Sequence, residues 1–92
     1  STDLPTHFSL DQNYPNPFNP STTIEFSLPY SIYVTLKVFN LLGEEIAALV
    51  SEELSAGNYS TRWAARDFTS GVYFYRLIAG SFVEAKKMLL LR

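Results

Sequence analysis

The sequence predicts an all-β domain, a sandwich of about seven antiparallel strands. Apolar and polar residues alternate with a period of two in several runs. Turn-forming residues separate these runs at intervals of roughly 8–15 residues, which is the spacing of a sandwich. The length of 92 residues suits one domain, and 47% hydrophobic residues, with 15% aromatic, supply enough apolar area for one core.

The beginning of the chain is rich in proline and cannot form a helix or a central strand. We expect a short first strand around Phe8 and Leu10, and then a stiff, turn-like segment from Asn13 to Pro20. Each proline lacks a backbone donor and pushes the residue before it towards extended geometry. Tyr14 and Phe18 are expected to pack on the body of the domain, and the segment is expected to shield a sheet edge.

Two amphipathic strands follow, at residues 22–28 and 33–39. In each strand every second residue faces the core. The inward residues are Thr22, Ile24, Phe26, Leu28, Val34, Leu36 and Val38. A turn over residues 40–43 comes next, in which Gly43 can adopt a positive φ without steric cost.

The stretch from Glu44 to Leu54 is ambiguous between helix and strand. Ile46, Leu49 and Val50 stand at helical spacing, and Glu44 with Glu45 would suit a helix N-terminus. In context, however, the stretch closes a hairpin with the strand at residues 33–39. We expect a strand over Glu45–Val50, because the sheet needs that partner.

Three more strands complete the sandwich. One is expected over residues 58–63, followed by a loop over 64–70. The run from Val72 to Ile78 is largely apolar on both parities, which indicates a central strand covered on at least part of each face. A turn at residues 79–81 leads into the last strand, Phe82–Leu91, which we expect at a sheet edge.

The residues with reactive side chains do not form a known catalytic or metal-binding pattern. The chain has no cysteine, and His7 is its only histidine, so the usual nitrogen and sulfur metal sites cannot be assembled. Adjacent glutamates on a strand point to opposite faces, which does not suit a glycosidase pair. We therefore expect no catalytic, cofactor or metal site and no enzymatic activity. A net charge of −2 without a basic stripe argues against nucleic acid, and no apolar run is long enough to span a membrane.

The aromatic residues allow two interpretations. Trp63, Tyr73 and Tyr75 could form an exposed platform that stacks sugars, which would make the chain a carbohydrate-binding or adhesive accessory module. Alternatively they are core residues between two sheets. Both strands alternate correctly for the core, and we favour that interpretation.

Several blocks of the sequence resemble one family in its order. They are LDQNYPNPFNPSTTI (residues 10–24), VFNLLGE (38–44), AGNY (56–59), SGVYFYR (70–76) and KKMLL (86–90). Together they resemble the type A C-terminal sorting domain of the type IX secretion system (Por secretion), found in Bacteroidetes and related bacteria. The motif positions are Asn13, Pro15, Asn16, Pro17, Phe18, Pro20, Gly43, Gly57, Gly71 and Tyr73. One departure follows Trp63, where the chain reads AARD instead of an acidic residue and glycine.

The resemblance implies an immunoglobulin-like or fibronectin-like sandwich over residues 8–92, joined by a linker at residues 1–7 to an upstream cargo domain in the same precursor. It implies export through the periplasm and outer membrane to the cell surface or the exterior. The implied partners are the type IX machinery and a sortase-like surface protease. No signal peptide opens the chain, so we expect residues upstream of Ser1 to direct the first step. Related domains of flagellar hook-capping proteins leave structural assembly as another possibility.

The last strand is the predicted recognition element. We expect the machinery to read Lys86, Lys87, Met88 and Leu89, docking on a sheet edge by strand addition. The alternative is that the two lysines are edge charges that prevent aggregation.

Overall fold

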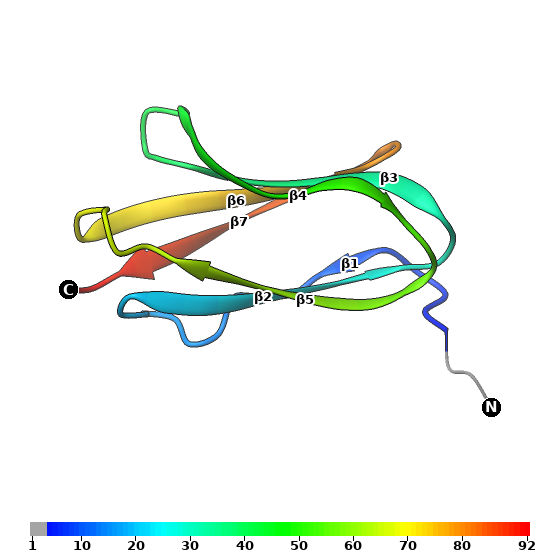
Figure 1. Ribbon diagram of the computed structural model, residues 1–92, viewed down its shortest axis with the longest axis horizontal. Coiled ribbons are helices and arrows are strands. Elements are labelled where there is room, and N and C mark those ends of the chain that lie inside the picture. The colour runs from blue at the N-terminus through cyan, green and yellow to red at the C-terminus, as the bar shows by residue number, and fades with distance from the viewer. Residues whose placement is uncertain (1–3) are drawn as a thin grey trace.

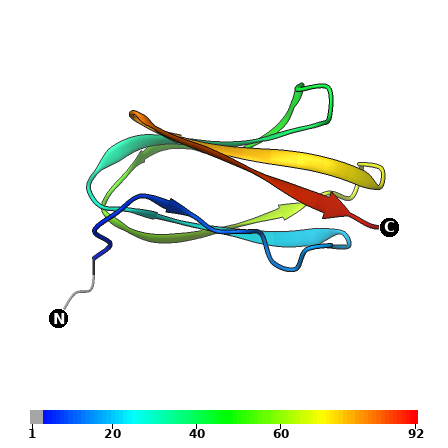
Figure 2. The same ribbon diagram turned by 180° about the vertical axis from the view of Figure 1, so that it is seen from behind.

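The computed structural model describes residues 4–92 as a sandwich of two antiparallel sheets (Figure 1). Sheet A has the strand order β1-β2-β5 and sheet B the order β4-β3-β6-β7. The strands are β1 (Ser9–Leu10), β2 (Ser21–Leu28), β3 (Ile32–Phe39), β4 (Glu45–Leu54), β5 (Gly57–Ala64), β6 (Gly71–Ala79) and β7 (Phe82–Leu90). The prediction of an all-β sandwich with seven antiparallel strands is confirmed. The described chain begins and ends at opposite ends of the long axis (Figures 1 and 2).

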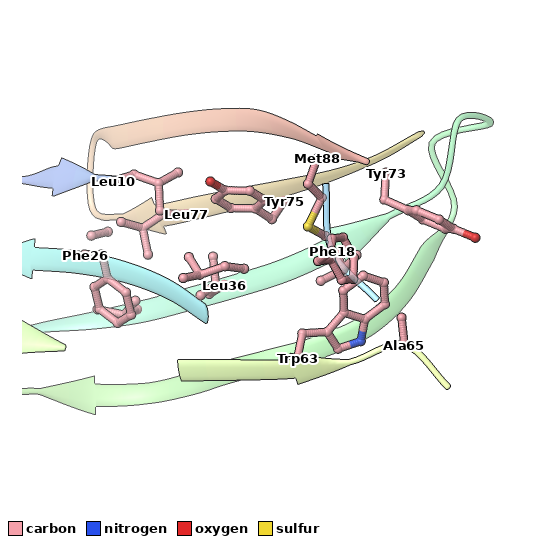
Figure 3. Packing of buried hydrophobic residues seen from close by; sticks show 14 of the residues in the cluster. Leu10, Phe18, Phe26, Leu36, Trp63, Ala65, Tyr73, Tyr75, Leu77 and Met88 are labelled. Carbon is pink, nitrogen blue, oxygen red and sulfur yellow. The ribbon is translucent and has the colours of Figure 1, made fainter. Parts of the chain in front are cut away.

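The core lies between the sheets and includes the apolar inward residues that the alternation predicts. Ile24, Leu28, Val34, Leu36 and Val38 are fully buried, each at 0% exposure. Trp63, Tyr73 and Tyr75 also lie in this layer (Figure 3). Burying each large side chain stabilises the fold by about 1.5–3 kcal/mol. The core interpretation of the three aromatic residues is therefore confirmed, and none of them is available as a sugar platform.

Two β-bulges in β4 explain why its apolar residues stand at helical spacing. Leu36 lies opposite Val50 and Lys37 opposite Ala48, so Leu49 is an extra residue on β4. A second irregularity makes Ile46 extra. Each bulge resets the period of two, and Ile46, Leu49 and Val50 all pack against the core despite their three- and four-residue spacing. The predicted strand is confirmed and continues to Leu54.

Strand β6 is central and β7 is an edge strand of sheet B, as predicted. Tyr73 lies near the start of β6, and its hydroxyl donates to the carbonyl oxygen of Thr69 at 2.7 Å. A tyrosine in this position that bonds a few residues upstream is the tyrosine corner of immunoglobulin-like sandwiches. It fixes the end of the loop that leads into β6.

Turns close the hairpins where the sequence indicates them. Gly43 has φ +82°, which L side chains rarely adopt, and it ends the turn between β3 and β4. Asn40 organises that turn, because its side-chain oxygen accepts hydrogen bonds from the amides of Leu42 and Glu44 at 2.9 and 3.0 Å. Gly57 and Gly71 are the first residues of β5 and β6.

Candidate recognition surface

The proline segment, residues 13–20, connects the two sheets along one side of the sandwich. At its start Tyr14 exchanges two backbone hydrogen bonds of 2.9 Å with Thr23 of β2. At its far end Phe18 pairs with β7: its amide donates to Leu89 at 3.0 Å, and its carbonyl accepts from Leu91 at 3.0 Å. The segment therefore covers part of the β7 edge, as the sequence predicts.

The two aromatic residues of the proline segment behave differently. Phe18 is 2% exposed and packs beside Trp63, with ring centroids 5.8 Å apart, which confirms its predicted packing. Tyr14 is 80% exposed, so its predicted packing is wrong. Because Tyr14 pairs with β2 through its backbone, its side chain is free to point away from the core.

Asn13 is the buried polar centre of this connection. Its amide donates to the Tyr75 hydroxyl at 2.7 Å, and its Nδ2 donates to the Thr22 hydroxyl at 2.9 Å and to the Pro15 carbonyl at 3.2 Å. Its Oδ1 accepts from Gln12 Nε2 at 2.7 Å. Asn13 is 2% exposed, so each of these bonds offsets a desolvation cost. The motif positions at the start of the segment thus hold it against β2 and β6.

Tyr75 completes the network from the middle of β6. Its hydroxyl donates to the Asp11 carbonyl at 2.7 Å while accepting from Asn13. Burial raises the pKa of Tyr75 from 10.0 to about 12; the Asn13 amide opposes this shift, and the carboxylates of Asp11 and Glu84 add to it. The hydroxyl therefore stays protonated, and able to donate, across the neutral range.

The predicted recognition residues alternate between the two faces of β7. Tyr75 of β6 lies opposite Lys86, and Tyr73 lies opposite Met88. Because Tyr73 and Tyr75 face the core, Lys86 and Met88 lie on the inner face and Lys87 and Leu89 on the outer one. Met88 is 1% exposed and belongs to the core. Its side chain contributes to the fold and cannot be read from outside.

The two lysines differ in their surroundings. Lys86 forms an ion pair with Glu84 at 3.2 Å on the inner side of the edge strand. Inward-pointing charges of this kind discourage edge-to-edge aggregation. Lys87 is exposed on the outer face, and its carbonyl accepts from Gln12 Nε2 at 2.8 Å. Of the pair, Lys87 is the side chain that a partner can contact on the outer surface.

The edge of β7 is divided into a covered half and an open half. Leu89 and Leu91 bond to Phe18, so the odd-numbered residues of β7 present their backbone groups outwards. Asn16 also accepts from the Leu89 amide, at 2.9 Å, through its side-chain oxygen. Around Val83 and Ala85, no other strand within residues 4–92 pairs with this edge. A partner strand could therefore be added only to the first half of β7.

Arg92 forms a contact that the sequence alone did not indicate. Its Nη1 lies 3.1 Å from the Ala65 carbonyl oxygen and 2.8 Å from that of Phe68, and its amide donates to the Ser70 hydroxyl at 2.9 Å. The loop that departs from the family pattern is thus held by Arg92. No local pattern reveals such a pairing, because the partners are backbone carbonyls distant in sequence.

The described residues contain little that could perform chemistry. Among residues 4–92, no group of three or more histidine and carboxylate side chains is placed to hold a metal ion. His7 is exposed ahead of β1, where its Nδ1 lies 2.9 Å from the Thr6 hydroxyl. The described part of the chain also has no helix long and apolar enough to cross a membrane.

Comparison with known protein families gives one match. The chain matches the model of the family described as "Secretion system C-terminal sorting domain" over residues 12–91, nearly its whole length. No curated protein and no solved structure matches the chain.

Proposed function

The chain belongs to the family of secretion-system C-terminal sorting domains, and we propose that its folded sandwich presents the open half of β7 to the export machinery. The domain is a sorting signal for type IX secretion, and the protein that carries it is exported across the outer membrane to the cell surface or the exterior. Sorting implies an interaction with the type IX machinery as part of a larger precursor.

The divided edge of β7 is the main support for docking at this strand. The proline segment occupies the edge at Leu89 and Leu91, while the backbone groups of Val83 and Ala85 point outwards. Strand addition uses main-chain hydrogen bonds for affinity and neighbouring side chains for specificity. Lys87 stands at the end of the open half, on the outer face. In this proposal Met88 and Leu89 support recognition indirectly, Met88 by filling the core and Leu89 by anchoring the proline segment.

Deleting residues 86–92 would not test this proposal, because the deletion also removes Met88 and Leu90 from the core. The substitution Ala85→Pro is sharper. It removes one outward amide while leaving the β6 partners intact, and proline is tolerated on edge strands where the N–H faces solvent. The control Ala85→Ser keeps the amide and the small side chain.

Both variants are fused behind a periplasmic reporter in a type IX-competent host, and the thermal unfolding of the isolated domains is compared. Ala85→Pro should retain the reporter in the periplasm while its domain stays folded, and Ala85→Ser should export it. Normal export of a folded Ala85→Pro fusion would contradict docking on this edge.

The two lysines provide a second matched pair. Lys86→Gln and Lys87→Gln make the same chemical change on opposite faces of one strand. We expect Lys87→Gln to lower export and Lys86→Gln to leave it near normal while increasing self-association, because Lys86 pairs with Glu84 on the inner side. The opposite ranking would assign recognition to Lys86.

We further propose that residues 1–7 link the domain to its cargo and that a sortase-like surface protease is a second partner. Leu4 to His7 lie ahead of β1 without regular secondary structure, and Ser1 to Asp3 lie outside the described residues. Sorting domains are generally non-catalytic, and we propose the same for this chain. Mass spectrometry of the released cargo identifies its new C-terminus and so tests the proposed linker. A C-terminus beyond residue 8 would contradict the proposal that residues 1–7 are the linker.

A further inference from the structure

The outer faces of the two sheets have opposite chemical characters. Sheet A presents small polar and charged side chains in facing pairs: Thr23 with Arg62, Glu25 with Ser60, and Ser27 with Asn58. Sheet B presents rows that combine apolar and cationic residues: Thr35, Ile78 and Val83; Lys37, Arg76 and Ala85; Phe39, Phe74 and Lys87. Apolar surface with embedded arginine is typical of protein interfaces.

A groove lies on the outer face of sheet B beside the turn between β3 and β4. It has a volume of about 240 Å³ and is lined by Phe39, Asn40, Leu41, Gly43, Phe74, Arg76 and Ala85. Leu41 and its neighbour Leu42 are 68% and 83% exposed, so the turn projects apolar side chains beside the groove. The lining is thus mostly apolar, with one fixed cation.

The cation in the groove is Arg76, whose charge is not balanced by an ion pair. Its guanidinium lies over the Phe39 ring, 4.6 Å from the centroid. Its Nε is buried and has no hydrogen-bond partner. The two ion pairs recorded among residues 4–92 are Lys37 with Glu45 and Lys86 with Glu84, and neither includes Arg76.

Arg76 also shares its row of sheet B with a second cation. Lys37 lies directly opposite Arg76 on β3, and like charges in facing positions of a sheet are destabilising. Glu45 neutralises Lys37 at 3.2 Å, which leaves the positive field of Arg76 directed into the groove. Departures from such local pairing rules are typical of functional sites.

We propose that this groove binds an acidic, apolar peptide segment of a protein partner. One carboxylate of the segment pairs with Arg76, and its flanking aliphatic or aromatic side chains pack on Phe39, Leu41 and Phe74. A planar guanidinium on an aromatic ring is well suited to bidentate pairing with a carboxylate. Lys87, in the row beside Arg76, favours the same negative charge. The site uses side chains on the outer face of sheet B, whereas strand addition uses backbone groups at the edge of β7, and the two surfaces share Ala85 and Lys87.

Binding is measured by titrating the isotope-labelled domain with short acetylated peptide amides and following its amide NMR signals. The first probe has the sequence Leu-Asp-Phe-Leu, and the matched probe replaces aspartate by asparagine. We expect saturable shifts confined to residues around Phe39, Leu41, Phe74 and Arg76, with a dissociation constant on the order of 1 mM or tighter. The asparagine peptide should bind roughly tenfold more weakly.

The variants Arg76→Gln and Arg62→Gln supply the protein controls. Arg62 lies on the outer face of sheet A, so only Arg76→Gln should abolish the shifts, and its otherwise unchanged spectrum would show that the fold persists. The proposal is overturned if no saturable shift is seen, if the shifts lie elsewhere, or if they survive in Arg76→Gln. Polygalacturonate provides carboxylates without apolar side chains. If polygalacturonate, and not the peptide, shifts the NMR signals around Phe39, Phe74 and Arg76, the groove is a polysaccharide site instead and the proposal is overturned.

Discussion

The backbone amide of Asn13 donates to the hydroxyl of Tyr75 at 2.7 Å, across 62 positions of the chain. The same hydroxyl donates to the carbonyl of Asp11 at 2.7 Å. One phenol in the middle of β6 therefore fixes the chain where it leaves sheet A and starts towards the edge of β7. The position of the proline segment depends on this buried network.

Replacing Asn13 by alanine should destabilise the domain by about 2–3 kcal/mol, because the hydroxyl of Thr22 and the carbonyl of Pro15 lose their bonds to a buried amide. Denaturant unfolding measures the effect. Asn58→Ala is the matched control, because the Asn58 side chain is exposed and its Oδ1 accepts from the Ser27 hydroxyl at 2.8 Å. Equal losses in the two variants would show that the network is not stabilising.

Tyr75 should make stability fall at alkaline pH. Its pKa is about 12 in the folded state against 10.0 ordinarily, so the folded state holds the proton more tightly. The contribution of Tyr75 to the free energy of unfolding is complete below pH 10.0 and is lost as the pH rises through about 12. Two pKa units correspond to at most about 2–3 kcal/mol.

The variant Tyr75→Phe should be less stable than the wild type at neutral pH, by about 1–3 kcal/mol. It should also lose less stability between neutral and alkaline pH. Tyr33→Phe is the control, because Tyr33 is 55% exposed. An alkaline loss that is unchanged in Tyr75→Phe would exclude Tyr75 as its source.

Phe18→Ala should cost about 3–5 kcal/mol, the range for emptying a buried phenylalanine site. Tyr14→Ala, on the same segment, should change the free energy of unfolding by less than about 0.5 kcal/mol because its ring is exposed. Calorimetry of both variants tests the difference. If the two melt together, the proline segment is not anchored through Phe18.

Arg92→Ala should loosen the loop at residues 64–70. The substitution removes charged donors from the carbonyls of Ala65 and Phe68, at an expected cost of about 1–2 kcal/mol. Hydrogen exchange of the Phe68 amide, which bonds to Ala65 at 3.3 Å, should become faster. Arg66→Ala, which removes an exposed side chain of the same loop, should leave that exchange rate unchanged.

Much of the fold follows from the sequence because the period of two survives in most strands. Residues 22–28 and 33–39 show it without interruption, and their inward residues are those of the core. In β4 the two bulges at Ile46 and Leu49 disturb the period, and only the need for a hairpin partner favoured a strand. In β4 the spacing of apolar residues favours a helix, whereas pairing with β3 requires a strand, and the structure follows the pairing with β3.

Long-range polar contacts were harder to predict. Tyr14 and Phe18 look alike in the sequence, yet one bonds to β2 through its backbone and the other fills the core. The opposite faces of Lys86 and Lys87 could have been derived from the parity of Met88 and Leu90. The contacts of Arg92 could not, because backbone carbonyls carry no residue-specific signal.

The central claim is that the folded sandwich itself is the sorting signal. The most direct measurement is the fraction of a periplasmic reporter, extended by residues 1–92, that reaches the surface of type IX-competent cells, compared with cells that lack the machinery. We predict surface display for the wild type only where the machinery is present, and retention of Phe18→Ala at a temperature where that domain is unfolded. Periplasmic retention of the folded wild-type fusion, or equal display of the unfolded variant, would contradict the claim.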